Sequence, residues 1–244
     1  MKAVGCVKEV NLYPVKSMRG TSVREATLYW YGLNGDRKYA FVRSGARSSF
    51  PWLTGREVPA LLQYEPHFVF PDEPMRSDIC VKTPSGQVLP LESPELKQTL
   101  TAEYSEDISL LRLNRGTYDA MPVSLMTENS LERLGHNLNE PLDSRRFRAN
   151  LILQTESMDD EPEGAWMNAL LTFGERPDSA EIRVSHRTKR CVMINLEPDT
   201  GEHSANILKE VAKTMQACAG VYGTVSKLGS IKVGDAVYLE HNGS

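Results

Sequence analysis

Residues 221–240, VYGTVSKLGSIKVGDAVYLE, contain the pattern that decides the fold class of this chain. Apolar and polar residues alternate in two short runs, and the Gly234-Asp235 pair between them is typical of a turn. The stretch therefore predicts two β-strands joined by that turn. Short strands separated by turn residues, when they recur along a chain, indicate a β-barrel or a β-sandwich.

The first half of the chain repeats this pattern. Residues 4–13 (VGCVKEVNLY) predict one strand. A hairpin is expected between residues 26–31 and 39–42, because Asn34-Gly35-Asp36 is a strong turn signal. A second hairpin is expected around Pro84-Ser85-Gly86 for the same reason.

The second half mixes helices with strands. Thr127 is a suitable N-cap for a helix with a leucine face, and residues 205–217 predict another helix. Strands and helices do not alternate regularly, which argues against a doubly wound sheet. A boundary between two domains is expected near residues 114–117. Further strands are expected over residues 110–113, 148–155, 182–185 and 191–196.

Charge and hydropathy exclude several classes of function. The 244 residues carry 28 basic and 32 acidic side chains, a net charge of −4 at pH 7, without a basic run that would suit nucleic acid. The N-terminal residues include Lys2, Lys8 and Glu9 and so lack the apolar stretch of a signal peptide. No apolar run reaches the roughly 18 to 20 residues of a membrane helix. We therefore expect a cytoplasmic protein that contacts neither nucleic acid nor membrane.

The cysteines are spaced too widely for a zinc knuckle or a disulfide framework. No P-loop, dinucleotide-binding, HExxH or GxSxG motif occurs. A zinc site can be drawn from His186, Cys191 and His203, but these residues lack the spacing typical of zinc ligands. The four cysteines are Cys6, Cys80, Cys191 and Cys218.

Residues 13–20 (YPVKSMRG) follow the first predicted strand and group Lys16, Ser17 and Arg19 beside a glycine. Such a turn suits an oxyanion or a phosphate, because the cations supply charge while Ser17 and free backbone N–H groups donate hydrogen bonds. The alternative is an exposed basic turn. Arg37, which follows the predicted hairpin turn, is a weaker candidate of the same kind.

A run of three arginines, RRFRAN, leads into a predicted buried strand. Alternation along a strand places Arg146, Arg148 and Asn150 on one face. An Arg and an Asn at the start of a strand can hold a phosphate or the polar edge of a ring. The alternative is a surface rim in which the arginines pair with Glu140 or Asp143.

Residues 186–191 (HRTKRC) place Arg187, Lys189 and Arg190 around Cys191. Nearby cations lower the pKa of a thiol and favour the thiolate, which binds metals and attacks electrophiles. The other three cysteines fit inert core positions. Together these segments describe a basic pocket with one thiolate, which suits an anionic cofactor whose metal the thiolate ligates.

Seven short motifs occur in order along the chain: Tyr13-Pro-Val-Lys-Ser17, Gly32-Leu-x-Gly-Asp-Arg37, Thr54-Gly-Arg56-x-x-Pro59, Arg146-Phe-Arg-x-Asn150, Arg190-Cys191, Pro198-Asp-Thr-Gly201 and Gly229-Ser-Ile-Lys-Val-Gly-Asp235. They resemble the molybdenum cofactor sulfurase C-terminal (MOSC) domain family with its N-terminal β-barrel partner domain. Within that family, the resemblance is to the amidoxime-reducing components of mitochondria and their bacterial relatives. It spans nearly the whole chain and depends on the order of the motifs rather than on any single one.

The resemblance implies a mostly β fold of the α+β class, with an N-terminal β-barrel-like domain (residues 1–115) and a MOSC β-barrel domain (residues 116–242). It implies a molybdenum cofactor (Mo-molybdopterin) between the domains and, at the level of the family alone, pyridoxal phosphate binding. The role of metal ligand falls on Cys191, and Asp119 is a second catalytic candidate. The family's cofactor-binding positions correspond to Lys16, Ser17, Arg37, Arg148, Asn150 and Arg190.

The implied activity is the reduction of N-hydroxylated or N-oxygenated small molecules at molybdenum. The sequence has no ferredoxin-type cysteine cluster and no flavin motif, so we expect a separate electron-donor protein of the ferredoxin, flavin or cytochrome type. The alternatives are a carrier, which holds sulfur as a Cys191 persulfide or the cofactor on its thiolate, and a binding module that has lost its cofactor. Two departures from the family pattern are Ala149, which replaces a usual proline, and the reshaped acidic segment 159–164 before Trp166. In addition, strict alternation turns Arg190 away from Cys191.

Overall fold

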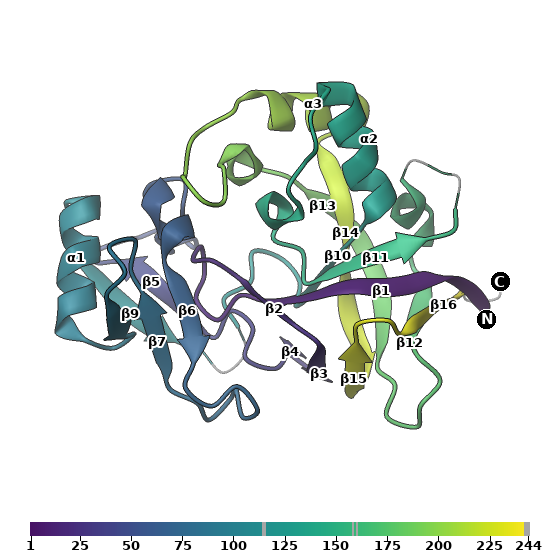
Figure 1. The fold of residues 1–244 in the computed structure, drawn as a ribbon, viewed down its shortest axis with the longest axis horizontal. Coiled ribbons are helices and arrows are strands. Elements are labelled where there is room, and N and C mark those ends of the chain that lie inside the picture. Colours follow the sequence, from purple (N-terminus) through teal and green to yellow (C-terminus); the bar gives the residue numbers. More distant parts are fainter. Residues whose placement is uncertain (114–115, 158, 160, 242–244) are drawn as a thin grey trace.

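The computed structural model describes residues 1–113, 116–157, 159 and 161–241 (Figure 1). Strands dominate this part of the chain, which also contains three α-helices, and the predicted mostly β fold of the α+β class is confirmed. A β-barrel lies beside a smaller β-rich region, which we call the N-terminal lobe (residues 13–20 and 37–112) (Figure 1). Across the described residues, no helix combines the length and the apolar character needed to span a membrane.

Seven strands close the barrel in the order β11-β10-β14-β13-β12-β16-β1, because β1 pairs with both β16 and β11. Only β10 and β11 run parallel among these neighbouring pairs in the described residues. The barrel strands are β1 (Lys2–Leu12), β10 (Val123–Thr127), β11 (Leu151–Thr155), β12 (Leu170–Phe173), β13 (Glu181–Lys189), β14 (Cys218–Lys227) and β16 (Ala236–Glu240), and β2 (Thr21–Val23) extends the sheet at β1.

The barrel interior is filled by apolar side chains from several strands. Val7, Leu153, Val184, Val221 and Val237 are all buried in one cluster. Burial of this apolar surface is the main force that holds the strands together, and closure leaves few unpaired strand edges. The barrel therefore gives the site a rigid wall.

The N-terminal lobe has its own core, formed by two small sheets and one helix. One sheet pairs β5 (Tyr39–Arg43) with β9 (Ile108–Arg112), and the other joins β6 (Glu65–Phe68), β7 (Ile79–Lys82) and β8 (Val88–Pro90). The helix is α1 (Pro94–Tyr104). A third sheet, of β3 (Glu25–Tyr29), β4 (Gly32–Leu33) and β15 (Gly229–Lys232), joins segments from the two ends of the chain.

Two further helices pack against each other outside the barrel, at the top of Figure 1. They are α2 (Glu128–Leu138) and α3 (Asn206–Thr214), and both were expected from the sequence. Thr127 caps α2 as predicted, because its Oγ1 accepts a hydrogen bond from Ser130 N at 3.3 Å. The structure adds α1, whose signal was Ser93 ahead of Pro94: the Ser93 hydroxyl accepts from Leu96 N.

One predicted hairpin is confirmed and one is wrong. Strands β7 and β8 pair across the turn at Gly86. Strand β3, by contrast, pairs with β4 and β15, and β5 pairs with β9. The turn at Asn34-Gly35-Asp36 exists, with Asp36 N donating to Leu33 O at 3.0 Å, but it carries the chain from the third sheet into the N-terminal lobe.

Three predictions about strands also differ from the structure. Residues 221–240 contain parts of three strands rather than two, and the turn at Gly234-Asp235 joins β15, in the third sheet, to β16, in the barrel. Residues 192–195 form a 3-10 helix, η4 (Val192–Asn195), because Ile194 and Asn195 are buried against the end of α3. Strand β11 begins only at Leu151, because Arg148 has a left-handed backbone and ends the 3-10 helix η2 (Ser144–Phe147). The alternation argument that put Arg146, Arg148 and Asn150 on one face therefore fails.

The predicted boundary near residues 114–117 falls partly on residues 114–115, which lie outside the described residues. The division of the chain into residues 1–115 and 116–242 stays a prediction. The structure adds that β1, from the start of the chain, belongs to the barrel formed with later strands.

Candidate cofactor and active site

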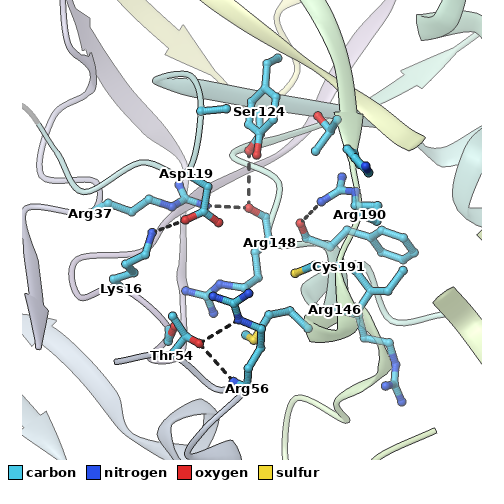
Figure 2. A pocket seen from close by; sticks show the side chains of 18 of the residues that line it. Lys16, Arg37, Thr54, Arg56, Asp119, Ser124, Arg146, Arg148, Arg190 and Cys191 are labelled. Carbon is cyan, nitrogen blue, oxygen red and sulfur yellow. Dashed lines mark hydrogen bonds and ion pairs between the residues drawn. The ribbon is translucent and has the colours of Figure 1, made fainter. Parts of the chain in front are cut away.

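A cavity of about 380 Å³ lies between the N-terminal lobe and the barrel (Figure 2). Among the described residues that line it, eight side chains are cationic and one is a carboxylate, so the cavity is strongly positive. The carboxylate is Asp119, and the cations are Lys16, Arg37, Arg56, Arg146, Arg148, Arg187, Lys189 and Arg190.

Lys16 and Ser17 reach the cavity from the turn after β1. Lys16 N donates to Tyr39 O at 2.8 Å, which holds this turn against β5. The Lys16 side chain is 7% exposed, and its Nζ donates to Thr117 O and to Asp119 Oδ1, both at 2.6 Å. Burial lowers the pKa of Lys16, while Asp119 opposes that shift. The alternative of an exposed basic turn is therefore wrong for these two residues.

Asp119 faces the open side of the cavity, with a side chain that is 59% exposed. Burial would raise the pKa of Asp119, but Lys16, followed by Arg37 and Arg56, holds it below its ordinary value. Asp119 is therefore a carboxylate at neutral pH, and the proton of the pair stays on Lys16 Nζ. Figure 2 shows this pair beside Arg37.

Arg37 is fixed by the residue that precedes it. Its Nη1 donates to Asp36 Oδ2 at 2.5 Å, and its Nη2 donates to Arg148 O at 2.9 Å. Burial would lower the pKa of Arg37, but the Asp36 carboxylate outweighs burial and raises it. Asp36 Oδ1 also accepts from Tyr13 N at 2.7 Å, so this one carboxylate ties Arg37 to the end of β1.

Asn150 lies behind the cavity wall rather than in its lining. Its Oδ1 accepts from Arg37 Nη1 at 3.3 Å and from Ser124 Oγ at 3.0 Å, while its Nδ2 donates to Asn11 O at 3.1 Å. Asn150 is almost fully buried, at 1% exposure. Its place in the structure is that of a residue that positions Arg37.

Arg148 enters the cavity from the end of η2. Its Nη1 donates to Met18 O at 2.7 Å, and its Cζ lies 4.3 Å from the centroid of the Tyr13 ring, which Arg37 also contacts at 4.7 Å. Burial lowers the pKa of Arg148 to about 10, so its guanidinium stays charged at neutral pH. Its Nη2 is buried and has no hydrogen-bond partner among the described residues.

Three cavity residues share an uncommon backbone conformation. Ser17, Arg37 and Arg148 have φ values of 66°, 47° and 52°. Non-glycine residues adopt this left-handed region at a cost of roughly 1–3 kcal/mol each, and such residues cluster at functional sites. All three are residues for which the family resemblance implies cofactor binding.

Cys191 lines the cavity two residues after the end of β13 and is exposed, whereas the other three cysteines are half-buried. Arg190 precedes it and is held by two backbone carbonyls: its side chain donates to Phe147 O and to Ala219 O, both at 2.7 Å. Burial lowers the pKa of Arg190, and its Nη2 has no partner in the described part of the chain. Because β13 ends at Lys189, strand alternation does not turn the Arg190 side chain away from the cavity.

Sequence reasoning missed several lining residues. Arg56 belongs to a motif noted in the sequence, Thr54-Gly-Arg56, which was the available signal. Ser124 and Tyr222 carry no such signal, since only the pairing of β10 with β14 places them opposite each other beside the cavity.

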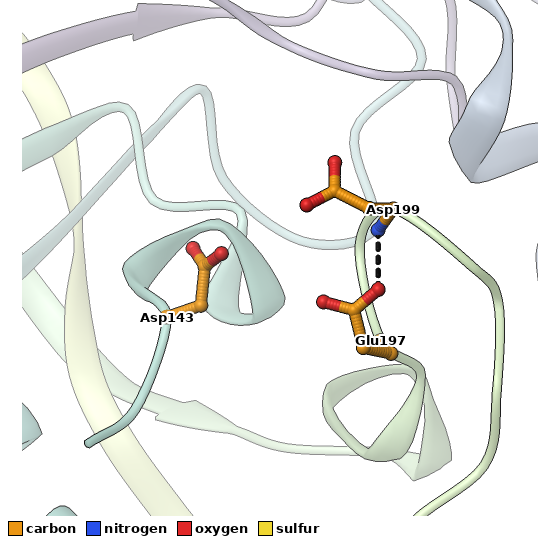
Figure 3. A group of neighbouring side chains, drawn as sticks. All are labelled: Asp143, Glu197 and Asp199. Carbon is orange, nitrogen blue, oxygen red and sulfur yellow. Dashed lines mark hydrogen bonds between the residues drawn. The ribbon is translucent and has the colours of Figure 1, made fainter.

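The zinc site drawn from His186, Cys191 and His203 does not form among the described residues, where one other group has metal-binding spacing. That group is Asp143, Glu197 and Asp199 (Figure 3). Arg145 already forms ion pairs with Asp143 at 2.5 Å and with Asp199 at 2.7 Å. Its guanidinium therefore neutralises two of the three carboxylates. For Arg145, the predicted rim pairing with Asp143 is confirmed.

Comparison with known families identifies the chain. The profile of the MOSC domain matches residues 113–238, and that of the MOSC N-terminal beta barrel domain matches residues 4–120. The chain belongs to the MOSC family. This MOSC protein is 24% identical to mitochondrial amidoxime reducing component 2 of Bos taurus over 98% of its own length and 84% of the relative. It is 27% identical to mitochondrial amidoxime-reducing component 1 of Homo sapiens, over 50% of this chain and 37% of that one.

Among solved structures, this MOSC protein resembles the YUAD protein from Bacillus subtilis, with a TM-score of 0.52. The match covers 98% of this chain and 97% of that chain, at 11% sequence identity. At that identity the likeness concerns the fold alone. It agrees with the barrel and its neighbouring lobe.

The cavity of this MOSC protein fits the anionic cofactor associated with its family. The buried Nη2 atoms of Arg148 and Arg190 lack hydrogen-bond acceptors among the described residues, and an anionic group would supply them. Lys16 and Arg37 add two more fixed positive charges to the same cavity. Cys191 offers a thiol at its edge.

Proposed function

We propose that this protein is a molybdenum-dependent oxidoreductase that reduces N-hydroxylated or N-oxygenated small molecules with electrons from a separate donor protein. The observation that carries the proposal is one exposed thiol, Cys191, at the edge of a cavity lined by eight cationic side chains. The names of its relatives, mitochondrial amidoxime reducing components, support the reaction class.

In this proposal Lys16, Ser17, Arg37 and Arg148 would hold the phosphate and the pterin, and Cys191 would ligate the metal with Arg190 beside it. When bound, the cofactor would supply the redox chemistry that removes oxygen from the substrate nitrogen. Asn150 would keep Arg37 in place through its Oδ1.

Conversion of an N–OH group into N–H with release of water consumes two electrons and two protons. The Lys16–Asp119 pair is suited to the protons, because Lys16 Nζ carries one and contacts Asp119 Oδ1 at 2.6 Å. Asp119 is more than half exposed and so links this proton to solvent. The proposed role of Asp119 is to stabilise the protonated form of Lys16 Nζ, and water at the exposed Asp119 carboxylate would supply the next proton.

The test begins with protein purified from a host that makes molybdopterin. Molybdenum by mass spectrometry and pterin by fluorescence are expected at about one per chain in the wild type. Cys191→Ser should lose the metal, and its reduction of benzamidoxime with a chemical reductant should fall by at least about 10³-fold, because the thiolate ligand is gone. Cys80→Ser, on β7 and outside the cavity lining, is the matched control. Metal and turnover that persist in Cys191→Ser would refute the proposal.

A second candidate function is a carrier that holds sulfur as a persulfide on Cys191. It is favoured by the exposure of this thiol, since a sulfur atom in transit must reach a partner. The same preparation separates the two: sulfur released by cyanide from wild type but not from Cys191→Ser, without molybdenum, indicates the carrier.

A further inference from the structure

Exposure divides the cavity cations into two sets. Lys16 is buried, and Arg37, Arg148 and Arg190 are at most partly exposed. Arg56, like Lys189 and the Cys191 thiol, is exposed and lies at the mouth of the cavity. The inner cations suit a cofactor that stays bound, whereas a cation at the mouth meets molecules that come and go.

The backbone brings Arg56 to the segment that carries the thiol. A Cβ added at the neighbouring Gly55 would lie 3.0 Å from Met193 Cε, so the 54–56 turn packs directly on the residues after Cys191. This approach crosses from the N-terminal lobe to the barrel side of the cavity. In Figure 2, Thr54 and Arg56 lie at the bottom of the view, below Asp119 and Arg37.

The Arg56 side chain is oriented by local contacts and forms no direct ion pair with the described residues, although Asp119 lies within electrostatic range. Its Nε donates to Thr54 Oγ1 at 3.2 Å, and its Cζ lies 4.8 Å from the centroid of the Phe50 ring. Among the described residues, no carboxylate forms an ion pair with it, whereas Lys16, Arg37 and Arg187 each have one. Its two Nη groups are therefore the free edge of a guanidinium that is already positioned.

We propose that Arg56 recognises an anionic group on the substrate, so that the enzyme prefers N-oxygenated compounds that bear a carboxylate or a phosphate. This inference depends on the proposed function above, whose substrate class it narrows. A guanidinium with both Nη groups free matches the two oxygens of either anion, and the positive mouth raises the rate of encounter with it. The Phe50 ring contacts one face of this guanidinium and helps to hold it in position.

The test compares three substrates on the cofactor-loaded protein: benzamidoxime, its 4-carboxylate and its 4-phosphonate. Arg56→Gln should raise the KM of an anionic compound that Arg56 recognises about ten times more than it changes the KM of benzamidoxime. The corresponding amidines have no N–O bond to reduce and all carry the same amidinium charge, so they give a readout independent of turnover: the Kd of the carboxylate or phosphonate, measured by calorimetry, should rise by the same factor relative to that of benzamidine itself. Arg56→Lys should fall between wild type and Arg56→Gln, because lysine keeps the charge but not the planar fork.

Arg76→Gln is the matched control, because Arg76 is an exposed arginine outside the cavity lining. A rise confined to the carboxylate or to the phosphonate supports the inference and names the anion. Equal KM and Kd changes for the compounds with and without the added anionic group, or no change in any, would overturn it. Failure of the proposed function looks different: no substrate is turned over by wild type, yet calorimetry of the amidines still reports on Arg56.

Discussion

Buried guanidinium groups without carboxylate partners are the most unusual residues of this protein. Arg148 and Arg190 donate only to backbone carbonyls among the described residues, and each keeps one Nη atom without a partner. Burial of a charge without compensation is unfavourable, so these residues oppose folding until an anion binds. Binding of an anionic ligand explains the burial of these two guanidinium groups better than a contribution to folding stability does.

The Lys16–Asp119 pair makes a testable contribution to stability at acid pH. The folded pKa of Asp119 lies below its ordinary value of 3.8, because Lys16 outweighs burial. The contribution is therefore present above about pH 4 and is lost as the pH falls through the folded pKa. The stability difference between wild type and Asp119→Asn should be constant above about pH 4 and should disappear once the pH has fallen through the folded pKa of Asp119.

Thermal unfolding of both proteins across this range measures that difference. Asp72→Asn, at an exposed residue of the 70–78 loop, should follow the wild type at every pH. A constant difference between wild type and Asp119→Asn would show that Asp119 acts through something other than its charge.

Among the elements, β1 decides whether the barrel closes. It pairs with β11 and β16, and its register with β16 shifts between Ala3 and Gly5. Gly5 has a φ of 153°, and a Cβ there would lie 1.9 Å from Gln154 O on β11. No side chain fits this contact without moving the strand.

Gly5→Ala should therefore destabilise the protein by about 2 kcal/mol, as overpacking of a closed strand pair does. The free energy of unfolding in urea measures the effect. Gly164→Ala is the control, because an added Cβ there meets Glu161 at an ordinary distance of 3.5 Å. Equal unfolding free energies for wild type and Gly5→Ala would mean that β1 shifts at no cost.

The cavity lies where the N-terminal lobe meets the barrel. Repulsion among its cations therefore affects the stability of both parts. Its lining comes from segments that lie far apart in the sequence, from Lys16 to Tyr222. An anion bound between them favours the folded state by mass action.

Cofactor-free protein should accordingly be stabilised by inorganic phosphate, by about 2.7 kcal/mol when phosphate reaches about 100 times its Kd. Thermal unfolding in phosphate, against chloride at equal ionic strength, measures this gain. Arg148→Gln should lose most of it, while Arg76→Gln should keep it, since Arg76 lies outside the cavity lining. A gain of equal size in Arg148→Gln would place the anion elsewhere.

The sequence by itself determined the features that depend on near neighbours. The Thr127 cap, the turn at Gly86 and the basic runs around Lys16, Arg148 and Cys191 are all local, and the first two are present in the structure as predicted. The ordered motifs identified the family, which the family profiles confirm. The roles assigned to the site residues stay predictions until the cofactor is measured.

Tertiary structure alone decided the features that need distant partners. The pairing of β3 with β15, the 3-10 helix after Cys191, the left-handed turn at Arg148 and the burial of Asn150 behind the wall follow from barrel closure and core packing. The physical reason is that caps and turns are settled by hydrogen bonds over a few residues, whereas strand partners are settled by which apolar faces can be buried together. The same closure turns scattered arginines of a nearly neutral chain into one strongly positive cavity.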